Sequence, residues 1–391
     1  MKFRVFTLSS ARSDFGILSS LIKKLEKSKK FDSRLIVSGS HFERKFGLTV
    51  NEIKKDKIKK YEFVKIQNNL FNKFDDKEIF NRYFKAFSNF FKKRKPHLLI
   101  VLGDRFETLS AVLVAKFLSI PIAHIHGGEV TIGSYDDSFR HCITKIASIH
   151  FTSHRKYKNR VIQLGENPKT VFDVGSLSSE RLKSFKFYSK AYLQKTYKII
   201  FGQKNYLVTL HPETENIVEF KKKNKIFFEF IQHISNANIF FTLPSPDIGH
   251  DLILDEIQKI LKNKNIFLIK SPGYKGYVSL VKYVDCVIGN SSSGFYEVPT
   301  LKKFTLNVGT RQKGRIELKS IISCGFDKKK LLKTLEQIAK MKNNNNLYFK
   351  KSKNIKTANI IIDKLSNYLD NFYLSKKKIL PKEFYDIEKK N

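Results

Sequence analysis

The 391-residue sequence lacks any long apolar run, and both its cysteines and its acidic residues are few. No stretch reaches the roughly 18 uninterrupted apolar residues that a membrane-spanning helix needs, so we expect no membrane partner. Residues 1–8 are too few and too interrupted by charge for a signal peptide, and their pattern favours a first strand. Together these absences predict a cytoplasmic protein.

The three cysteines, Cys142, Cys286 and Cys324, are odd in number and scattered, and they do not have the spacing of a metal site. Each lies in or beside an apolar run, which predicts buried thiols. Reduced cysteines of this kind fit a reducing compartment.

Acidic residues are outnumbered, with 36 Asp and Glu against 74 Lys and Arg, and the net charge is +38. Such an excess can indicate a nucleic acid, an anionic membrane face or an anionic substrate as partner. However, the lysines occur along most of the chain and are not interleaved with aromatic residues as in RNA-binding modules. Heavy use of Lys, Asn, Ile and Phe indicates a compositional bias, so we expect no nucleic-acid partner. The alternative, a nucleic-acid or anionic-surface binding protein, predicts tight binding with a steep salt dependence.

Short dense apolar runs are abundant, and they predict the buried strands of parallel sheets. In the first half, strands are predicted at 3–8, 34–38, 98–102 and 121–126, with a clear helix over 109–118. Alternation of strands and helices indicates parallel βαβ units. The pattern restarts after residue 200, with strands predicted at 207–210, 239–243, 266–269 and 286–289.

The length exceeds that of a usual single core, so two domains are expected. We predict an α/β fold with doubly wound domains over 1–183 and 204–365, joined by a linker over 184–203 that has no strong period. An amphipathic helix is predicted over 354–373, and residues 366–391 are expected as a tail that packs back on the first domain. Asn343–Asn346 is predicted to be a surface loop. The strand ends of the two domains are expected to face one cleft, where ligands of such sheets bind.

Two groups of polar residues follow strands of the first domain. Arg12 lies in Ser9–Gly16, where a cation and small residues before a helix suit phosphate binding. The alternative is a helix cap formed by Ser13 or Asp14. Asp104, in Gly103–Glu107, is a candidate acid or base, and Arg105 beside it could bind phosphate. A structural ion pair is the alternative for these two residues.

The densest group is His124–Glu129, followed by Asp136, Asp137, Arg140 and His141. The spacing of His124 and His126 predicts that both lie on one face of a strand, and Gly127-Gly128 would let the backbone approach a ligand. Histidines and carboxylates are also metal ligands. Because there is neither a His-x-x-x-His pair nor clustered cysteine, no metal is expected.

Three groups follow strands of the second domain. His211, in Leu210–Thr214, would face the cleft, although a single histidine at a strand end is a weak signal. Gly289–Glu297 is the strongest: a buried strand runs into small hydroxyl residues whose backbone N–H groups and side chains can hold a pyrophosphate. Glu297 could accept both hydroxyls of a ribose. Gly309–Arg315 offers further cations. An ordinary serine N-cap explains one serine of this string but not all of them.

Several motifs occur in the same order in a known family. They are G-D-R-F-E, H-I-H-G-G-E, the run Asp136–Lys145, V-I-Q-L-G-E, H-P-E-T, G-N-S-S-S-G and G-T-R-Q-K-G-R. With them the chain resembles the hydrolysing UDP-N-acetylglucosamine 2-epimerases of sialic-acid synthesis, from Ser10 to the closing Phe384–Ile387.

This resemblance implies a glycosyltransferase-B fold of two Rossmann-like domains with an interdomain cleft. It implies release of UDP and N-acetylmannosamine from UDP-N-acetylglucosamine and water, by elimination to a glycal and hydration, without a cofactor. It also implies a UDP-sugar as partner and assembly into homodimers or homotetramers. Residues that match the family's acid/base positions are Asp104, Asp136 and His211. Residues that match its nucleotide and phosphate positions are Arg12, Arg105, Ser291, Ser292, Glu297 and Arg311. Ser245–Gly249 is assigned only a loose nucleotide or gating role.

The chain departs from many relatives at one position. Where they have a glutamate in the third place of H-x-E-G-G-E, this chain has His126. The sequence leaves open whether His126 or Glu129 takes the role of that carboxylate. It also leaves open two related functions: the hydrolysing epimerases of legionaminic-acid synthesis, which act on a 2,4-diacetamido-6-deoxy sugar nucleotide, and the non-hydrolysing epimerases, which keep UDP attached.

Overall fold

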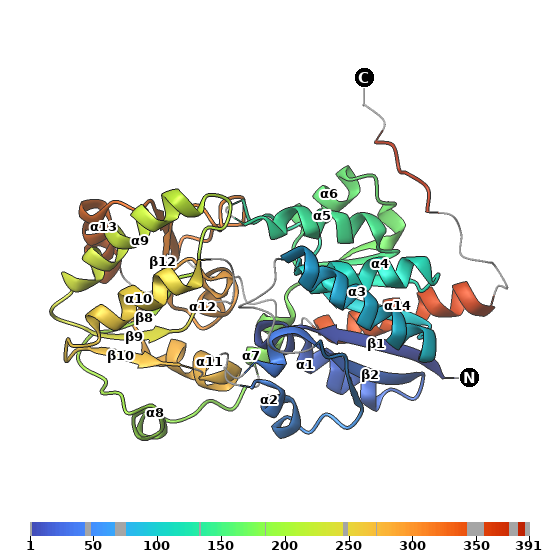
Figure 1. The fold of residues 1–391 in the computed structure, drawn as a ribbon, viewed down its shortest axis with the longest axis horizontal. Helices are drawn as coiled ribbons and strands as arrows, with labels where there is room; N and C mark the ends of the chain where they lie inside the picture. Colours follow the sequence, from blue (N-terminus) through green and yellow to red (C-terminus); the bar gives the residue numbers. More distant parts are fainter. Residues whose placement is uncertain are drawn as a thin grey trace. The chain divides into compact units, whose positions relative to one another are not determined.

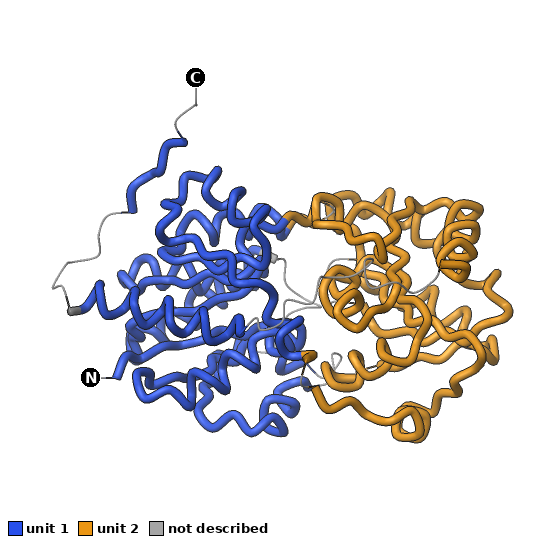
Figure 2. The backbone as a smooth tube through the Cα atoms, turned by 180° about the vertical axis from the view of Figure 1, so that it is seen from behind, with its two compact units in different colours: residues 1–129, 136–181, 354–391 blue, residues 130–135, 182–353 orange. Residues whose placement is uncertain are grey.

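A computed structural model describes residues 2–43, 48–66, 76–132, 134–183, 185–244, 249–270, 272–341, 356–374 and 382–387 (Figure 1). The contacts between residues divide the chain into two units, coloured separately in Figure 2. Unit 1 comprises residues 1–129, 136–181 and 354–391, and unit 2 comprises residues 130–135 and 182–353. The Asn343–Asn346 loop and most of the Ser245–Gly249 segment lie outside the described residues.

The described part of unit 1 is built on a seven-stranded parallel sheet in the order β3-β2-β1-β4-β5-β6-β7. Chain order reverses between β1 and β4, which is the switch point of a doubly wound sheet. The predicted strands at 3–8, 34–38, 98–102 and 121–126 are confirmed as β1, β2, β4 and β5. The strands are β1 Phe3–Ser9, β2 Phe31–Val37, β3 Tyr61–Phe63, β4 Leu98–Leu102, β5 Ile122–Ile125, β6 Ile149–Thr152 and β7 Val171–Asp173.

Helices cover both faces of this sheet. Because side chains of a strand alternate between its faces, Leu98 and Ile100 enter one core while Leu99 and Val101 enter the other. Burial on both faces explains why β4 is apolar at every position. The described helices are α1 Arg12–Lys27, η1 Gly39–Phe42, α2 Val50–Lys55, α3 Asp76–Lys93, α4 Phe106–Phe117, α5 Asp136–Ile146, α6 Arg155–Gln163, η3 Pro168–Thr170, α7 Leu177–Lys183 and α14 Thr357–Leu374. The chain passes to unit 2 along α7.

Unit 2 contains, among its described residues, a six-stranded parallel sheet in the order β10-β9-β8-β11-β12-β13. The four strands predicted after residue 200 are confirmed as β8, β9, β10 and β11. The elements are β8 Asn205–Thr209, β9 Asn238–Thr242, β10 Ile266–Ile269, β11 Cys286–Gly289, β12 Phe304–Val308, β13 Ile321–Cys324, α8 Lys190–Tyr197, α9 Ile217–Gln232, α10 His250–Ile260, α11 Gly273–Tyr283, η4 Ser292–Phe295, α12 Glu297–Thr300 and α13 Lys328–Lys340.

The predicted division of the chain needs two corrections. The segment 184–203, expected to be a linker, contains α8 and belongs to unit 2, because Leu193 and Ile199 are buried in the core of that unit. The expected end of the second domain at residue 365 falls inside α14. That whole helix belongs to unit 1, where its apolar side chains enter the same core as those of α1.

Two other expectations concern exposure. Cys286 is buried and Cys324 partly buried, but Cys142 is exposed on α5, so the prediction of burial is wrong for that residue. Within the described ranges, none of the helices has the length and apolar character needed to cross a membrane.

Candidate functional site

Asp104 lies directly after β4, in a turn held by a buried histidine of the neighbouring strand. Nε2 of His124, on β5, donates to the carbonyl of Gly103 at 2.8 Å, and Nδ1 accepts from the Thr144 hydroxyl of α5 at 3.1 Å. Burial lowers the pKa of His124 to about 3, so its ring is neutral at pH 7. His124 therefore positions the Asp104 turn against α5 rather than exchanging protons.

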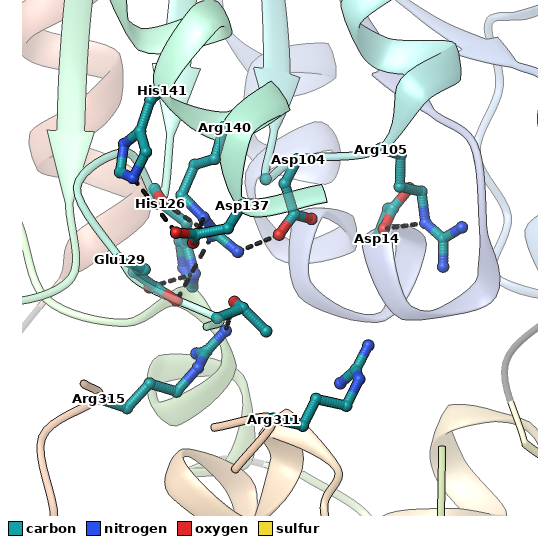
Figure 3. A network of polar contacts seen from close by, with 12 residues as sticks. Asp14, Asp104, Arg105, His126, Glu129, Asp137, Arg140, His141, Arg311 and Arg315 are labelled. Carbon is teal, nitrogen blue, oxygen red and sulfur yellow. Dashed lines mark hydrogen bonds and ion pairs between the residues drawn. The ribbon is translucent and has the colours of Figure 1, made fainter. Parts of the chain in front are cut away.

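Arg140 of α5 is the centre of the polar network of unit 1 (Figure 3). Its side chain is 3% exposed, and its Nη2 donates to Oδ2 of Asp104. Nη1 lies 3.3 Å from the carbonyl oxygen of His126 and 3.8 Å from Oε2 of Glu129, and Nε lies 3.9 Å from Oδ1 of Asp137. A guanidinium stays charged at any working pH. Arg140 thus brings together the carboxylates of Asp104, Glu129 and Asp137 from three segments.

His126 and Glu129, the two alternatives of the sequence, form one pair. Nδ1 of His126 lies 2.9 Å from Oε1 of Glu129, which also accepts from the Ser153 hydroxyl at 2.9 Å. The expectation that His124 and His126 share a strand face is wrong, because β5 ends at Ile125 and His126 has a φ of 66°. This left-handed conformation is uncommon outside glycine, and it turns His126 out of the strand direction.

The two glycines after His126 are used for packing. Gly128 has a φ of 76°, and a Cβ there would clash with the carbonyl of Tyr157 on α6. Arg160 of the same helix donates to the Gly128 carbonyl at 2.6 Å. The close approach expected toward a ligand is therefore, at Gly128, an approach to the backbone of α6.

Arg12 and Asp136 each begin a helix of unit 1, α1 and α5 respectively, and both are partly exposed. The Asp14 carboxylate accepts from the backbone N–H groups of Ser10 and Ala11 at 3.0 Å. Arg105 lies 3.7 Å from Asp14, while burial raises the pKa of this carboxyl. Both structural alternatives are thus present. Asp14 caps the start of α1, where Arg12 lies, and Arg105 forms an ion pair with Asp14.

In unit 2, Asn290 connects the loops that follow three neighbouring strands. Its side chain donates to the His211 carbonyl at 2.8 Å and accepts from the His211 N–H at 2.7 Å. Its own carbonyl accepts from Nε2 of Gln312 at 2.8 Å and lies 3.5 Å from Nη1 of Arg311. Because Asn290 is fully buried, these bonds hold the loops after β8, β11 and β12 together.

Glu213, two residues after His211, strengthens the same arrangement. Its Oε1 accepts from the N–H groups of Thr310 at 2.6 Å and Arg311 at 3.1 Å, and Lys223 lies 3.4 Å from Oε2. Glu213 is nearly buried, and its contacts fix the backbone from which the Arg311 side chain extends.

The serine string of unit 2 has a different local structure from the one expected. Ser291 caps η4, a 3-10 helix of four residues, and Glu297 begins the four-residue α12. So short a helix has almost no macrodipole to offer a phosphate. Ser292 is exposed, Ser291 is partly buried and Glu297 is buried, so the hydroxyls rather than a long helix remain the candidate phosphate ligands.

Comparison with known proteins identifies the family. The model of the family described as UDP-N-acetylglucosamine 2-epimerase matches residues 23–365. The chain belongs to this family. It is 36% identical over 329 residues to the GDP/UDP-N,N'-diacetylbacillosamine 2-epimerase (hydrolyzing) of Campylobacter jejuni, covering 82% of this chain and 84% of that protein. It is 32% identical over 391 residues to polysialic acid biosynthesis protein P7 of Escherichia coli, covering 98% and 97% of the two chains.

Solved structures of the family share the fold. UDP-GlcNAc 2-epimerase from Neisseria meningitidis, bound to UDP-GlcNAc, superposes with a TM-score of 0.77 at 18% identity, covering 93% of this chain and all of that one. The expected glycosyltransferase-B type of fold, with two Rossmann-like doubly wound units, is thereby confirmed.

Each unit groups its own predicted site residues. Unit 1 places Asp104, His126 and Glu129 in the Arg140 network, with Asp136 on the same helix as Arg140. Unit 2 gathers His211 and Arg311 around Asn290, and Ser291 follows directly. Within the described ranges, no group of three or more His, Cys, Asp or Glu is arranged to hold a metal ion.

Sequence reasoning gave no role to Arg140, Asn290, Glu213 or Gln312, although all four lie within or beside the motifs. For Asn290 and Gln312, which directly adjoin Ser291 and Arg311, the available signal was a polar residue next to a strand-end motif residue, where a buried side chain can join two loops. Arg140 lies inside α5, where this signal does not apply.

Proposed function

We propose that this epimerase is of the hydrolysing type and converts UDP-N-acetylglucosamine and water to N-acetylmannosamine and UDP. A base removes the C2 proton, the C1–O bond breaks with its electron pair leaving on UDP, and a C1=C2 double bond forms. Water then adds its oxygen to C1, and a proton is added to C2 from the opposite face. The reaction needs acid/base groups but no redox step, and we propose no cofactor.

The observation that carries this proposal is the Arg140 network. It holds Asp104 and the His126–Glu129 pair just beyond the ends of the adjacent strands β4 and β5, with Asp136 at the start of α5. Several proton-exchanging groups in one place suit a reaction that takes a proton from C2 and returns one. We assign the acid/base steps to these residues and to His211.

We assign UDP binding to the motif residues of unit 2. Ser291 and Ser292 offer hydroxyls to phosphate oxygens, Glu297 can accept the ribose hydroxyls, and Arg311 offers a guanidinium. Arg12 and Arg105 are proposed as further cations for the diphosphate, whose charge grows as the C1–O bond breaks. The family resemblance further supports a homodimer or homotetramer, measurable by light scattering, and a cytoplasmic location.

Proton NMR of the reaction in D2O tests the proposal. Incubation with UDP-N-acetylglucosamine should release UDP and N-acetylmannosamine that carries deuterium at C2. UDP-N-acetylmannosamine as the stable product would instead assign the non-hydrolysing reaction. Absence of any UDP release would refute this substrate.

A second candidate substrate is a UDP-linked 2,4-diacetamido-6-deoxy sugar. The observation that favours it is the 36% identity to the hydrolysing diacetylbacillosamine epimerase of C. jejuni, which exceeds the 32% identity to the polysialic acid protein. The same assay with UDP-N,N'-diacetylbacillosamine separates the two. Turnover of that compound alone would assign the diacetamido sugar nucleotide, and not UDP-N-acetylglucosamine, as the substrate.

Two substitutions test the assignment of residues. Asp104→Asn and His211→Ala should both leave the protein folded and abolish turnover, because each removes a proton-exchanging group. Matched controls are Asp173→Asn at the end of β7 and His233→Ala after α9, both at exposed positions. Wild-type rates in both site variants would contradict the assignment.

A further inference from the structure

The V-I-Q-L-G-E motif, residues 161–166, has no part in the proposed reaction, yet the C-terminal residues 382–387 dock on it. The N–H of Tyr385 donates to the carbonyl of Gly165 at 3.0 Å. Gly165 has a φ of 82°, and a Cβ there would clash with the ring of Phe384. Gly165 follows the end of α6 in a left-handed conformation that favours glycine, and the Phe384 ring of residues 382–387, which we call the clasp, packs directly on it.

Lys382 of the clasp caps the C-terminal end of α5. Its Nζ donates to the carbonyl oxygens of Lys145 and, at 2.6 Å, of Ala147, with that of Thr144 at 3.4 Å. The last carbonyls of a helix have no partner within it, and a cation there also complements the helix dipole. A residue more than 200 positions further along the chain thus supplies the cap of α5.

Glu166 holds this lysine in place. Its Oε2 lies 2.6 Å from Nζ of Lys382 and 2.9 Å from Nε2 of His150 on β6, and its Oε1 lies 3.2 Å from Nζ of Lys145 on α5. Burial would raise the pKa of Glu166, but hydrogen bonds from His150 and Lys382 outweigh it and lower the pKa. Burial lowers the pKa of Lys382 to about 8, so the ammonium form still predominates at pH 7.

The same helix carries candidate site residues toward its other end. Asp136 begins α5, and Arg140 contacts Asp104 and the carbonyl of His126. A helix of 11 residues is a stiff rod about 16 Å long, so a shift at its C-terminal end also moves its first turns. Fixing the end near Lys145 therefore fixes where Asp136 and Arg140 lie.

We propose that Lys382, paired with Glu166, is a positioning residue that holds α5 so that Asp136 and Arg140 stay in place for the reaction. The proposal rests on the proposed function for its effect on turnover. Its structural part, the fixing of α5, does not depend on which substrate is used.

The test compares full-length Lys382→Met with Lys382→Arg and with the matched control Lys85→Met, an exposed lysine of α3. Methionine keeps most of the length of the side chain and removes its charge. We expect Lys382→Met to lower kcat by about tenfold or more, because small displacements of reacting groups cost this much. KM should stay within about twofold, since UDP contacts are assigned to other segments. Lys382→Arg should restore most of kcat.

Hydrogen exchange provides the readout that needs no substrate. Amides of α5 should exchange faster in Lys382→Met than in wild type or Lys85→Met, with α9 of unit 2 as the internal reference. Glu166→Gln should have the same effects, and the double variant should be no worse than either single one.

The outcomes separate the two proposals. Unchanged exchange in α5, unchanged kcat, or a rise in KM alone would each contradict the positioning role proposed for Lys382. An equal loss of kcat in Lys382→Met and Lys382→Arg would also overturn it, because the positive charge would then not matter. If the wild-type protein releases UDP from neither sugar nucleotide, the proposed function is contradicted. The hydrogen-exchange data alone then test whether Lys382 fixes the position of α5.

Discussion

Arg140 is the side chain on which the carboxylates of unit 1 converge. Three acidic groups held close together, one buried and two partly buried, repel one another unless a cation lies among them. Arg140 is buried and contacts Asp104, Glu129 and Asp137 with different nitrogens of one planar group. Lysine has the same charge but a single nitrogen, so it cannot make these contacts at once.

Arg140→Lys should therefore separate geometry from charge. We expect kcat to fall by at least about tenfold, because Asp104 and Glu129 lose their common partner while the local charge is kept. Steady-state kinetics measures the effect, and circular dichroism shows that the variant is folded. Arg155→Lys on the exposed start of α6 is the control and should behave as wild type. A wild-type kcat for Arg140→Lys would contradict the role given to Arg140.

Among the elements, α14 shows how far the chain order and the spatial order differ. It follows the last described helix of unit 2 in sequence but packs on α1 of unit 1, with Ala358, Ile361, Leu365 and Leu369 fully buried. Its apolar periodicity predicts a helix, and the observed one begins and ends close to the predicted bounds. The periodicity says nothing about which core the apolar face enters.

Leu365→Ala should destabilise unit 1 by about 2–5 kcal/mol, since it removes a buried leucine and leaves a cavity. Hydrogen exchange resolved by segment measures this, with faster exchange expected in α1 and β1 and no change in β8 and β11. Ile360→Ala on the same helix, at a position 37% exposed, is the matched control and should have a small effect. Faster exchange confined to unit 2 would be evidence against the assignment of α14 to unit 1.

At the scale of the whole molecule, three of the buried histidines described in unit 1 are neutral at pH 7. His41 lies between the hydroxyls of Ser9 and Thr49, both at 2.8 Å, His124 lies between Gly103 and Thr144, and His150 contacts Glu166. Burial lowers the pKa of His41 and of His124 to about 3 and also lowers that of His150. In the unfolded chain these rings take up a proton near pH 6.5.

The stability of unit 1 should consequently fall as the pH drops from about 6.5 toward 3, because there the unfolded state binds protons that the folded state does not. Over this range His41 and His124 each contribute a slope of up to about 1.4 kcal/mol per pH unit, and His150 contributes with the same sign. Urea unfolding at pH 7, 6 and 5, followed by hydrogen exchange in unit 1, measures the slope.

His41→Gln is the matched variant, and its slope should be smaller by about the contribution of one histidine. The comparison cancels other groups, including Asp14, whose raised pKa contributes with the opposite sign. A slope equal to that of the wild type would contradict the neutral state assigned to His41.

The sequence by itself determined the elements that depend on local patterns. The apolar runs of β4 and β11 are buried on both faces, so composition alone identifies them as strands of parallel sheets. The motifs at strand ends, such as Gly103–Glu107 and His211–Thr214, could be found for the same reason, because a strand followed by polar residues is a local signal. The ordered motifs also sufficed to predict the family.

Only the tertiary structure decided which distant residues meet. That α14 belongs to unit 1 from its first residue, that His126 pairs with Glu129 in a left-handed turn, and that Arg140 gathers three carboxylates all depend on contacts between separate segments. The docking of Lys382 on the end of α5 is a further long-range case. Such contacts are selected by the packing of whole elements, and no spacing along the chain encodes them.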